Sequence, residues 1–254
     1  MNQRLYTNMN EHLHFGSVLK RSAGWASKMK ATSLPDSSSR RASPGRPHDT
    51  PGRKTSARIF DSAMRLFYER GYEGTTIRDI SDACGLTPAA IYNHYRSKDD
   101  ILWATIKWGH DELDRDLRDA LAAAGSSPID RLSTTIHAFV LRHTRFREAA
   151  RVTNREYGML EPRRRALIVE RRRQTRAFFQ SLINAAASDG GVQIAARHRR
   201  AKATSTMTAM AVINMVIMIA EWYRTGGPVS AEAVARHHAS LVVAMIRGYS
   251  DKRG

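Results

Sequence analysis

Hydrophobic residues recur at intervals of three and four along most of the chain after residue 55. In residues 56–70, for example, Ile59, Ala63, Leu66 and Phe67 share one face if the segment is helical. We therefore predict an all-α fold. The pattern predicts helices over residues 56–70, 77–83, 88–95, 98–124, 128–145, 148–157 and 162–188, then from 195 or 198 to 224 and from 231 to 247.

Local signals set the ends of two short helices and of the long helix that follows them. Thr87 is a good N-cap, and Pro88 falls at the first helical position, where a missing N–H is harmless. Ser97 caps the next helix, whose first turn carries two aspartates that the helix dipole favours. Two short helices joined by a glycine turn at residues 84–86 form a helix-turn-helix arrangement.

The second short helix has side chains suited to reading DNA. Ala90, Ile91 and the ring of Tyr95 would face the core. Small residues at positions 89 and 90 would let the backbone approach the floor of a groove, while hydroxyl, amide and ammonium groups reach phosphates or base edges. The alternative is an ordinary pair of short core helices with solvated ends. The outward residues, with one more donor from the next helix, are Thr87, Pro88, Ala89, Tyr92, Asn93, His94 and Lys98.

Charge and composition narrow the partners. The chain has 41 Lys and Arg against 24 Asp and Glu, a net charge of +17, which favours nucleic acid, an anionic membrane surface or a polyanionic ligand. The single cysteine, Cys84, excludes an internal disulfide framework and indicates a reducing compartment. The longest apolar stretch, residues 209–220, is too short to span a bilayer. Nucleophile-elbow, P-loop and dinucleotide motifs are absent, and no histidines have metal spacing, so we expect no catalysis, cofactor or metal.

Residues 1–54 differ from the rest of the chain in composition and in hydrophobic pattern. They hold ten Lys or Arg, few acidic residues and runs of Ser, Pro and Gly without helical or alternating period, so we predict a disordered basic extension. Three roles stay open: an organelle transit peptide, a minor-groove arm centred on Gly45-Arg46-Pro47, and an electrostatic arm for DNA. The extension could also be inert, or translation could start downstream, at Met9, Met29 or later.

Residues 75–102, TTIRDISDACGLTPAAIYNHYRSKDDIL, closely resemble the TetR family signature, and the upstream residues 63–72 fit its first helix. The resemblance implies a helix-turn-helix DNA-binding domain at 55–100 and a helical effector-binding and dimerisation domain at 101–250. It implies a homodimer formed through the last two helices, with Val234 and His238 near the seam. The apolar side of the last helix would consist of Leu241, Val242, Met245 and Ile246. It also implies phosphate or sugar contacts by Thr76, Thr87, Tyr92, His94 and Lys98, base contacts by Pro88, Ala89 and Asn93, and either kind by Arg78.

Residues 154–157 and 221–228 also look like the matching stretches of TetR-type regulators of acyl-CoA, fatty-acid and steroid catabolism. An acyl-CoA effector would place its acyl part among aromatic and methionine side chains and its phosphates against arginine forks. A free lipophilic or aromatic effector is the alternative. A further alternative is that the aromatic and methionine side chains belong to the core and that the arginines form a solvated helix face. The candidate ligand residues are Phe139, His143, Tyr157, Arg163, Arg164, Arg171, Arg172, Phe178, Met210, Asn214 and Trp222.

The sequence thus predicts a cytoplasmic, dimeric, ligand-responsive transcriptional regulator. We expect it to repress from a palindromic operator in double-stranded DNA and to be released by a small effector. The alternative from another class is an all-helical enzyme or lipid carrier with a basic surface for a phosphorylated substrate. A palindromic operator would be bound specifically only in the first case, since the enzyme would bind DNA weakly and without sequence preference.

Overall fold

A computed structural model describes residues 51–189 and 199–251 of the chain, and every regular element within these ranges is a helix, which confirms the all-α prediction. Residues 1–50, which include most of the expected basic extension, lie outside the described residues. The helices are α2 (Pro51–Arg70), α3 (Ile77–Cys84), α4 (Pro88–Tyr92), α5 (Lys98–Ala123), α6 (Pro128–Arg145), α7 (Arg147–Arg155), the 3₁₀ helix η3 (Glu156–Met159), α8 (Pro162–Asp189), α9 (Arg199–Ile217), α10 (Ile219–Trp222) and α11 (Ala231–Asp251).

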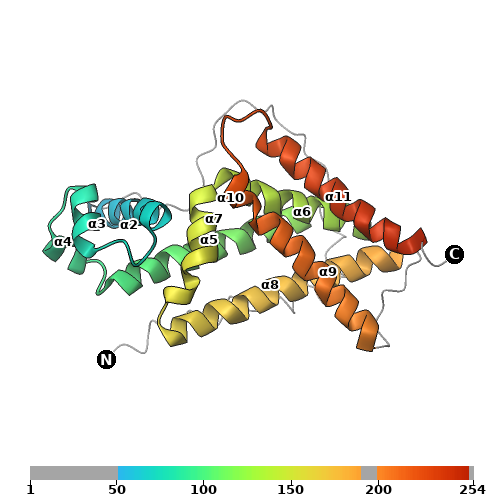
Figure 1. The fold of residues 1–254 in the computed structure, drawn as a ribbon, viewed down its shortest axis with the longest axis horizontal. Coiled ribbons are helices and arrows are strands. Elements are labelled where there is room, and N and C mark those ends of the chain that lie inside the picture. Colours follow the sequence, from blue (N-terminus) through green and yellow to red (C-terminus); the bar gives the residue numbers. More distant parts are fainter. Residues whose placement is uncertain (1–50, 190–198, 252–254) are drawn as a thin grey trace, which may run out of the picture. The chain divides into compact units, whose positions relative to one another are not determined.

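Helices α2, α3 and α4 pack together at one end of the long helix α5 (Figure 1). Ile59, Phe67, Ile80 and Ile91 fill their shared core and are at most 1% exposed. Gly85 makes the sharp turn between α3 and α4 with a positive φ of 62°, a conformation that glycine adopts without steric cost. The predicted helix-turn-helix arrangement is therefore formed.

Helix α7 connects this end of the molecule to the remaining helices. It packs against both α2 and α5, and Val152 on its buried face is 1% exposed. Helix α6 in turn contacts α5, α8, α9 and α11, and α11 lies alongside it over much of its length (Figure 1). Apolar side chains of α2, α5, α7 and α8 consequently belong to one continuous core cluster.

Helix α11 buries its apolar side within its own chain. Val234, Val242 and Ile246 are between 0% and 4% exposed in a single protomer. These three side chains therefore pack in the core of their own protomer, while the expectation that Val234 and His238 lie near the dimer seam stays a prediction. The apolar side chains that stay exposed on α9, α10 and α11 are Met207, Met210, Met218, Trp222 and Leu241.

Two boundaries near the chain start differ from prediction. Helix α2 begins at Pro51, so residues 51–54 are helical and do not belong to a disordered extension. Helix α4 ends at Tyr92 instead of Tyr95. A turn follows it, in which the N–H of Tyr95 donates to the carbonyl of Ile91 at 3.0 Å, and the N–H of Arg96 is taken by Asp100 in the first turn of α5. The Tyr95 hydroxyl then reaches back to Ser56 of α2 at 3.3 Å.

The helix expected to run to residue 224 is interrupted. Helix α9 ends at Ile217, and the short helix α10 ends at Trp222. The guanidinium of Arg147 donates a hydrogen bond of 2.8 Å to the carbonyl oxygen of Ala220, which continuation of the helix would have used for the N–H of Arg224. The residues proposed to start this helix, 195–198, lie outside the described ranges.

The segment Ser205–Trp222 is long and apolar enough to cross a membrane by length and composition alone. This corrects the view that the apolar stretch of the same region is too short. In the structure the segment packs as α9 and α10 against α6, α7 and α8, with Val212, Val216 and Ile219 buried. One face of the segment is therefore buried against these helices, while Met207 and Met218 on it are exposed.

Lys98 ties the turn between α2 and α3 to the start of α5. Its ammonium donates to the backbone carbonyls of Tyr72 at 2.8 Å and Thr75 at 2.7 Å, and it lies 4.1 Å from the centre of the Tyr72 ring. Two of the three ammonium protons are thus used within the protein. The charge holds the helix-turn-helix region on α5.

Replacing Lys98 with methionine should lower the free energy of unfolding by about 1–3 kcal/mol, because two part-buried carbonyls lose their donor. Urea unfolding followed by circular dichroism measures the change. Lys54→Met, which removes an exposed lysine from α2, is the matched control and should cost less than about 0.5 kcal/mol. Equal stability of the two variants would contradict the assigned role.

Candidate nucleic-acid interface and effector cavity

Helix α4 presents the expected residues to solvent. Thr87, Pro88, Ala89, Asn93 and His94 are exposed, and Tyr92 is 54% exposed, whereas Ile91 is fully buried on the opposite face. A small, polar and exposed helix face is the form that a recognition helix takes. The structure thus brings together the six outward residues of this helix, although their contacts with DNA stay a prediction.

Thr76 and Lys98, which flank the recognition helix, also form hydrogen bonds within the protein. The Thr76 hydroxyl accepts from the N–H of Asp79 at 3.1 Å and donates to its carboxylate at 2.6 Å, which forms a capping box at the start of α3. Lys98 keeps one proton free for a phosphate beside its two internal bonds. Arg78 is exposed on α3. Thr76 and Lys98 therefore also hold the domain together, and their phosphate contacts stay a prediction.

A cavity of about 220 Å³ lies among five helices of the C-terminal half. Its wall is mostly apolar and also carries several polar side chains. No acidic side chain is among the described residues that line it, while three arginines are. The lining consists of Gly109, His110 and Leu113 of α5; Phe139, Arg142 and His143 of α6; Ala149, Ala150, Thr153 and Asn154 of α7; Arg172, Thr175 and Arg176 of α8; and Met210, Ile213, Asn214 and Ile217 of α9.

The two histidines of this wall are buried and neutral. Burial, reinforced by the charges of Arg171 and Arg172, lowers the pKa of His110 from 6.5 to about 3. Burial likewise lowers the pKa of His143 to about 4, and its Nδ1 donates to the carbonyl of Phe139 at 2.9 Å. With Nδ1 carrying the proton, the Nε2 of His143 is an acceptor. Neither histidine can act as a cationic partner near neutral pH.

Of the four arginines expected to include the phosphate contacts, only one lines this cavity. Arg164 is paired with Asp99 and Asp100, and Arg171 with Asp111 at 2.7 Å and with Asp114. These carboxylates lie on α5 and neutralise the two guanidinium groups, which accordingly serve to join α8 to α5. Arg163 is exposed and does not line the cavity either. Arg172 alone of the four lines the wall.

Arg172 differs from its neighbours in lacking a carboxylate. It donates to the side-chain oxygen of Asn154 at 2.6 Å and lies 4.1 Å from the centre of the Tyr157 ring. Burial lowers the pKa of its guanidinium, because no carboxylate of the described residues stabilises the buried positive charge. Within the described ranges it forms no ion pair, so the positive charge is available to a ligand.

Of the other expected ligand residues, Phe139, His143, Met210 and Asn214 line the cavity. Phe178 is packed in the core against Phe179, and Tyr157 lies beneath Arg172 outside the wall. Trp222 is 52% exposed and stacks on His238. Assigning Phe178, Tyr157 and Trp222 to the cavity was therefore wrong, because their helices turn these rings elsewhere.

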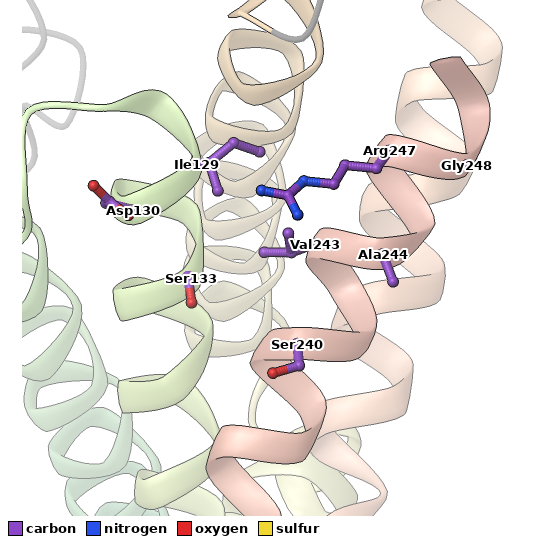
Figure 2. A pocket seen from close by; sticks show the side chains of 8 residues that line it. All are labelled: Ile129, Asp130, Ser133, Ser240, Val243, Ala244, Arg247 and Gly248. Atoms are coloured by element: carbon purple, nitrogen blue, oxygen red, sulfur yellow. The ribbon is translucent and has the colours of Figure 1, made fainter. Parts of the chain in front are cut away.

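A wider groove of about 560 Å³ lies between α6 and α11 (Figure 2). Small side chains line it, including Ser133 and Ser240, and Arg247 extends across it toward Ile129 (Figure 2). None of its lining side chains holds a buried polar atom without a partner. The enclosed cavity is accordingly the better candidate for the effector site.

Helix α7 also makes polar contacts on both sides of the molecule. Just after it, a carboxylate oxygen of Glu156 accepts from the backbone N–H of Tyr72 at 3.3 Å, at the start of the α2–α3 turn. On the other side, Arg155 donates to Glu221 of α10 at 2.9 Å, and Arg151 pairs with the same carboxylate at 3.1 Å. A shift of α7 at the cavity wall would consequently reach the helix-turn-helix region.

An exposed recognition helix, joined through α5 and α7 to a helical half that encloses a cavity, defines a helix-turn-helix regulator of transcription. The chain belongs to the TetR family. Residues 59–105 match the family model for bacterial regulatory proteins of the tetR family, and residues 125–246 match the model for the tetracyclin repressor-like C-terminal domain. The two models together match more than half of the chain, which confirms the expected resemblance.

Similar proteins cover both halves of the chain. It is 28% identical over 202 residues to the transcriptional repressor KstR2 of Rhodococcus jostii strain RHA1, a match over 76% of this chain and 90% of KstR2. A solved tetR-family regulatory protein from Rhodococcus RHA1 is 29% identical with a TM-score of 0.64, covering 76% and 97% of the two chains. AibR, solved with isovaleryl coenzyme A and operator DNA, is 26% identical with a TM-score of 0.62, covering 75% and 97%.

Sequence reasoning missed several residues of the cavity, chiefly His110, Thr153 and Arg176. Asn154 lies in the stretch 154–157 that carries the second resemblance, but it is not among the expected ligand residues. His110 had a usable signal, because it lies one turn after Ile106 on the buried stripe of α5. A histidine on such a stripe must be neutral and needs partners. The polar residues of α7 gave no comparable signal, since their orientation depends on where α5 and α8 pack.

The free energy of unfolding should fall as the pH is lowered below about 6.5. The unfolded chain binds a proton at His143 with the ordinary pKa, while the folded protein resists it down to a pKa of about 4. Between pH 6.5 and 5 this amounts to about 2 kcal/mol. Urea unfolding at pH 7 and pH 5 measures the loss, and the His143→Gln variant should lose about 2 kcal/mol less than the wild type.

The matched control is His94→Gln, which removes an exposed imidazole from the opposite end of the molecule. An unchanged loss in the His143→Gln variant would show that His143 takes up its proton in the folded state. The structure predicts the reverse.

Proposed function

We propose that the protein is a homodimeric repressor that binds a palindromic operator and leaves it when a small acyl effector, such as an acyl-CoA, enters the α5–α9 cavity. The observation that carries this is the placement of α7, which forms part of the cavity wall and contacts the helix-turn-helix region. The proposal assigns residues 51–100 to DNA and 101–250 to effector binding and dimerisation. A ligand-responsive DNA-binding repressor is also what the similar proteins support.

Residues of α4 would enter the major groove. Asn93 has an amide that can pair with a base edge, and the small Ala89 lets the helix approach closely. Tyr92, His94 and Thr87 would contact the flanking phosphates, and the Thr87 hydroxyl oxygen already accepts from the N–H of Ala90 at 3.2 Å. Its proton is therefore directed away from the helix, where a phosphate oxygen could accept it.

Dimerisation would use the exposed apolar side chains of the last helices. Met207 and Met218 are 62% and 54% exposed, and Leu241 of α11 is 40% exposed. An isolated chain rarely leaves several large apolar side chains uncovered on adjacent helices. A second copy would cover them by a two-fold interface, in agreement with the dimers typical of the family.

The similarity to AibR supports an acyl-CoA as effector class. Only the acyl group would fit inside, because about 220 Å³ is below the 300–1,000 Å³ typical of pockets for drug-sized ligands. The coenzyme would remain outside the cavity wall. A regulator of this kind needs neither catalysis nor a cofactor, and we place it in the cytoplasm with its DNA. An enzyme or lipid carrier accounts less well for the exposed face of α4.

Effector binding would act through α7. A ligand that contacts Thr153 and Asn154 can favour one position of α7 over another, and it releases DNA only by its difference in affinity for the two positions. The link from Glu156 to the N–H of Tyr72 then transmits the shift to the α2–α3 turn. The ion pairs from Arg164 to Asp99 and Asp100 keep the start of α5 attached to α8 meanwhile.

Replacing Asn93 with alanine should weaken operator binding by about 1–3 kcal/mol per half-site and leave binding to random duplex unchanged, if its amide makes a bidentate base contact. Tyr92→Phe, which removes a phosphate donor, should weaken both equally. Fluorescence anisotropy measures both affinities, with an operator selected from a randomised duplex pool. Equal losses on both duplexes for Asn93→Ala would refute its assignment to bases.

Replacing Glu156 with alanine should reduce the coupling between effector and operator. Addition of isovaleryl-CoA should weaken operator binding by about tenfold or more in the wild type, within the usual range of coupling energies, and by less than about threefold in the variant. The separate affinities for operator and effector should change little. Glu148→Ala, an exposed glutamate at the start of α7, is the control and should keep the wild-type coupling.

A further inference from the structure

We propose that the cavity recognises an acyl carbonyl oxygen, which accepts hydrogen bonds from His110 and Thr153; this rests on the effector function proposed above. The carbonyl can belong to a thioester or to a free carboxylate, because both offer the same oxygen acceptor. The inference deepens the proposed function, because it names the atom of the acyl effector that is recognised and the two residues that recognise it. It predicts that a hydrocarbon of equal shape without the carbonyl binds poorly.

The first observation is that both side chains are buried without partners. His110 is 4% exposed and Thr153 is 7% exposed, and both line the cavity. The two ring nitrogens of His110 and the Thr153 hydroxyl have no hydrogen-bond partner among the described residues of the protein. A buried polar group left in this state costs about 1–3 kcal/mol. Three such atoms on the wall of one cavity indicate that a bound ligand forms hydrogen bonds with them.

The second observation is that the backbone of α5 leaves room for the Thr153 hydroxyl. A Cβ atom added to Gly109 would lie 2.3 Å from the Thr153 Oγ1, far inside van der Waals contact. Glycine at this position therefore lets the hydroxyl approach the backbone of α5 one residue before His110. The two unpartnered groups consequently face the cavity from neighbouring points of α5 and α7.

The third observation concerns charge and hydrogen-bonding polarity. His110 is neutral at physiological pH, since burial holds its pKa at about 3, so it offers an N–H and no charge. Arg172 and Arg176 line the same cavity, and no carboxylate does among the described residues. The positive potential favours an oxygen that carries a large partial negative charge and accepts two hydrogen bonds. A carbonyl oxygen meets these conditions better than a hydroxyl group, which must also donate.

The cavity also limits the acyl group. Its volume of about 220 Å³ admits a short or branched acyl group and excludes the coenzyme. Phe139, Leu113 and Ile213 supply apolar wall around the hydrocarbon part. Polar recognition inside a small apolar cavity is the usual way in which such sites select one ligand over a hydrocarbon of similar shape.

Three probes test the proposal on the full-length protein by calorimetry. They are isovaleryl-CoA, the corresponding thioether isopentyl-CoA, which lacks only the carbonyl oxygen, and free isovalerate. We expect the wild type to bind isovaleryl-CoA about tenfold or more tightly than the thioether, the equivalent of one lost hydrogen bond. Tighter binding of isovalerate than of either CoA compound would assign the carbonyl to a carboxylate.

The variants isolate the two donors. Thr153→Val and His110→Leu should each bring the preference for thioester over thioether to within about threefold of unity, while binding of the thioether itself changes little. Thr175→Val is the matched control, because Thr175 lines the same cavity but its hydroxyl already donates to the carbonyl of Arg171 at 3.2 Å. It should keep the wild-type preference. Thermal unfolding of each variant checks that the fold is retained.

Equal affinity of the wild type for thioester and thioether would overturn the carbonyl proposal while leaving an acyl-CoA effector in place. So would a preference that persists in both Thr153→Val and His110→Leu. Failure of the proposed function is distinguishable, because operator binding would then respond to none of the three probes, and none would bind. A loss of preference in Thr175→Val equal to that in Thr153→Val would also overturn the assignment.

Discussion

Helix α7 packs closely against α5 at Gly109, where an added Cβ atom would lie 2.3 Å from the Thr153 Oγ1. A larger side chain at this position would force the Thr153 side chain to turn or α7 to shift. Helix α7 also packs against α2 on its other side, so its position affects both the cavity wall and the support of the helix-turn-helix region. The proposed effector site and the DNA-binding region thus share one supporting helix. A regulator needs this kind of shared element, since coupling requires one part that both sites bias.

The arginines show how charge is divided between structure and function. On α8, Arg164 and Arg171 meet aspartates of α5, and each pair fixes one helix against the other. Arg172, the next residue along, points to a different face and meets an amide and an aromatic ring. Adjacent residues on a helix are about 100° apart, so a run of arginines cannot act as one patch. The burial of an arginine without a carboxylate is the exception that a ligand-binding site can explain.

Most of the helices could be predicted from the sequence because their signals are local. Thr87 and Ser97 cap their helices as expected, and the helix from Pro128 ends at Arg145 as the periodicity indicates. The end of α10 could not be predicted, since it depends on Arg147, a residue more than seventy positions away in the chain. The cavity shares this limitation. Phe178 and Trp222 have the right chemistry for a ligand, but tertiary packing turns Phe178 into the core and Trp222 toward solvent.

The recognition helix was predictable for a related reason. Its exposed and buried faces follow from three-and-four spacing within one short segment, and no distant residue is needed to orient Tyr92 or Asn93. The effector site instead needs five helices, and each contributes one or two turns. Sequence signals for DNA binding are therefore concentrated, while those for the effector are dispersed. A family can keep the first pattern while the second varies, which is how one fold serves many effectors. In this chain the proposed effector site combines the neutral His110, Thr153 and Arg172, which come from three different helices and of which Arg172 has no carboxylate partner among the described residues.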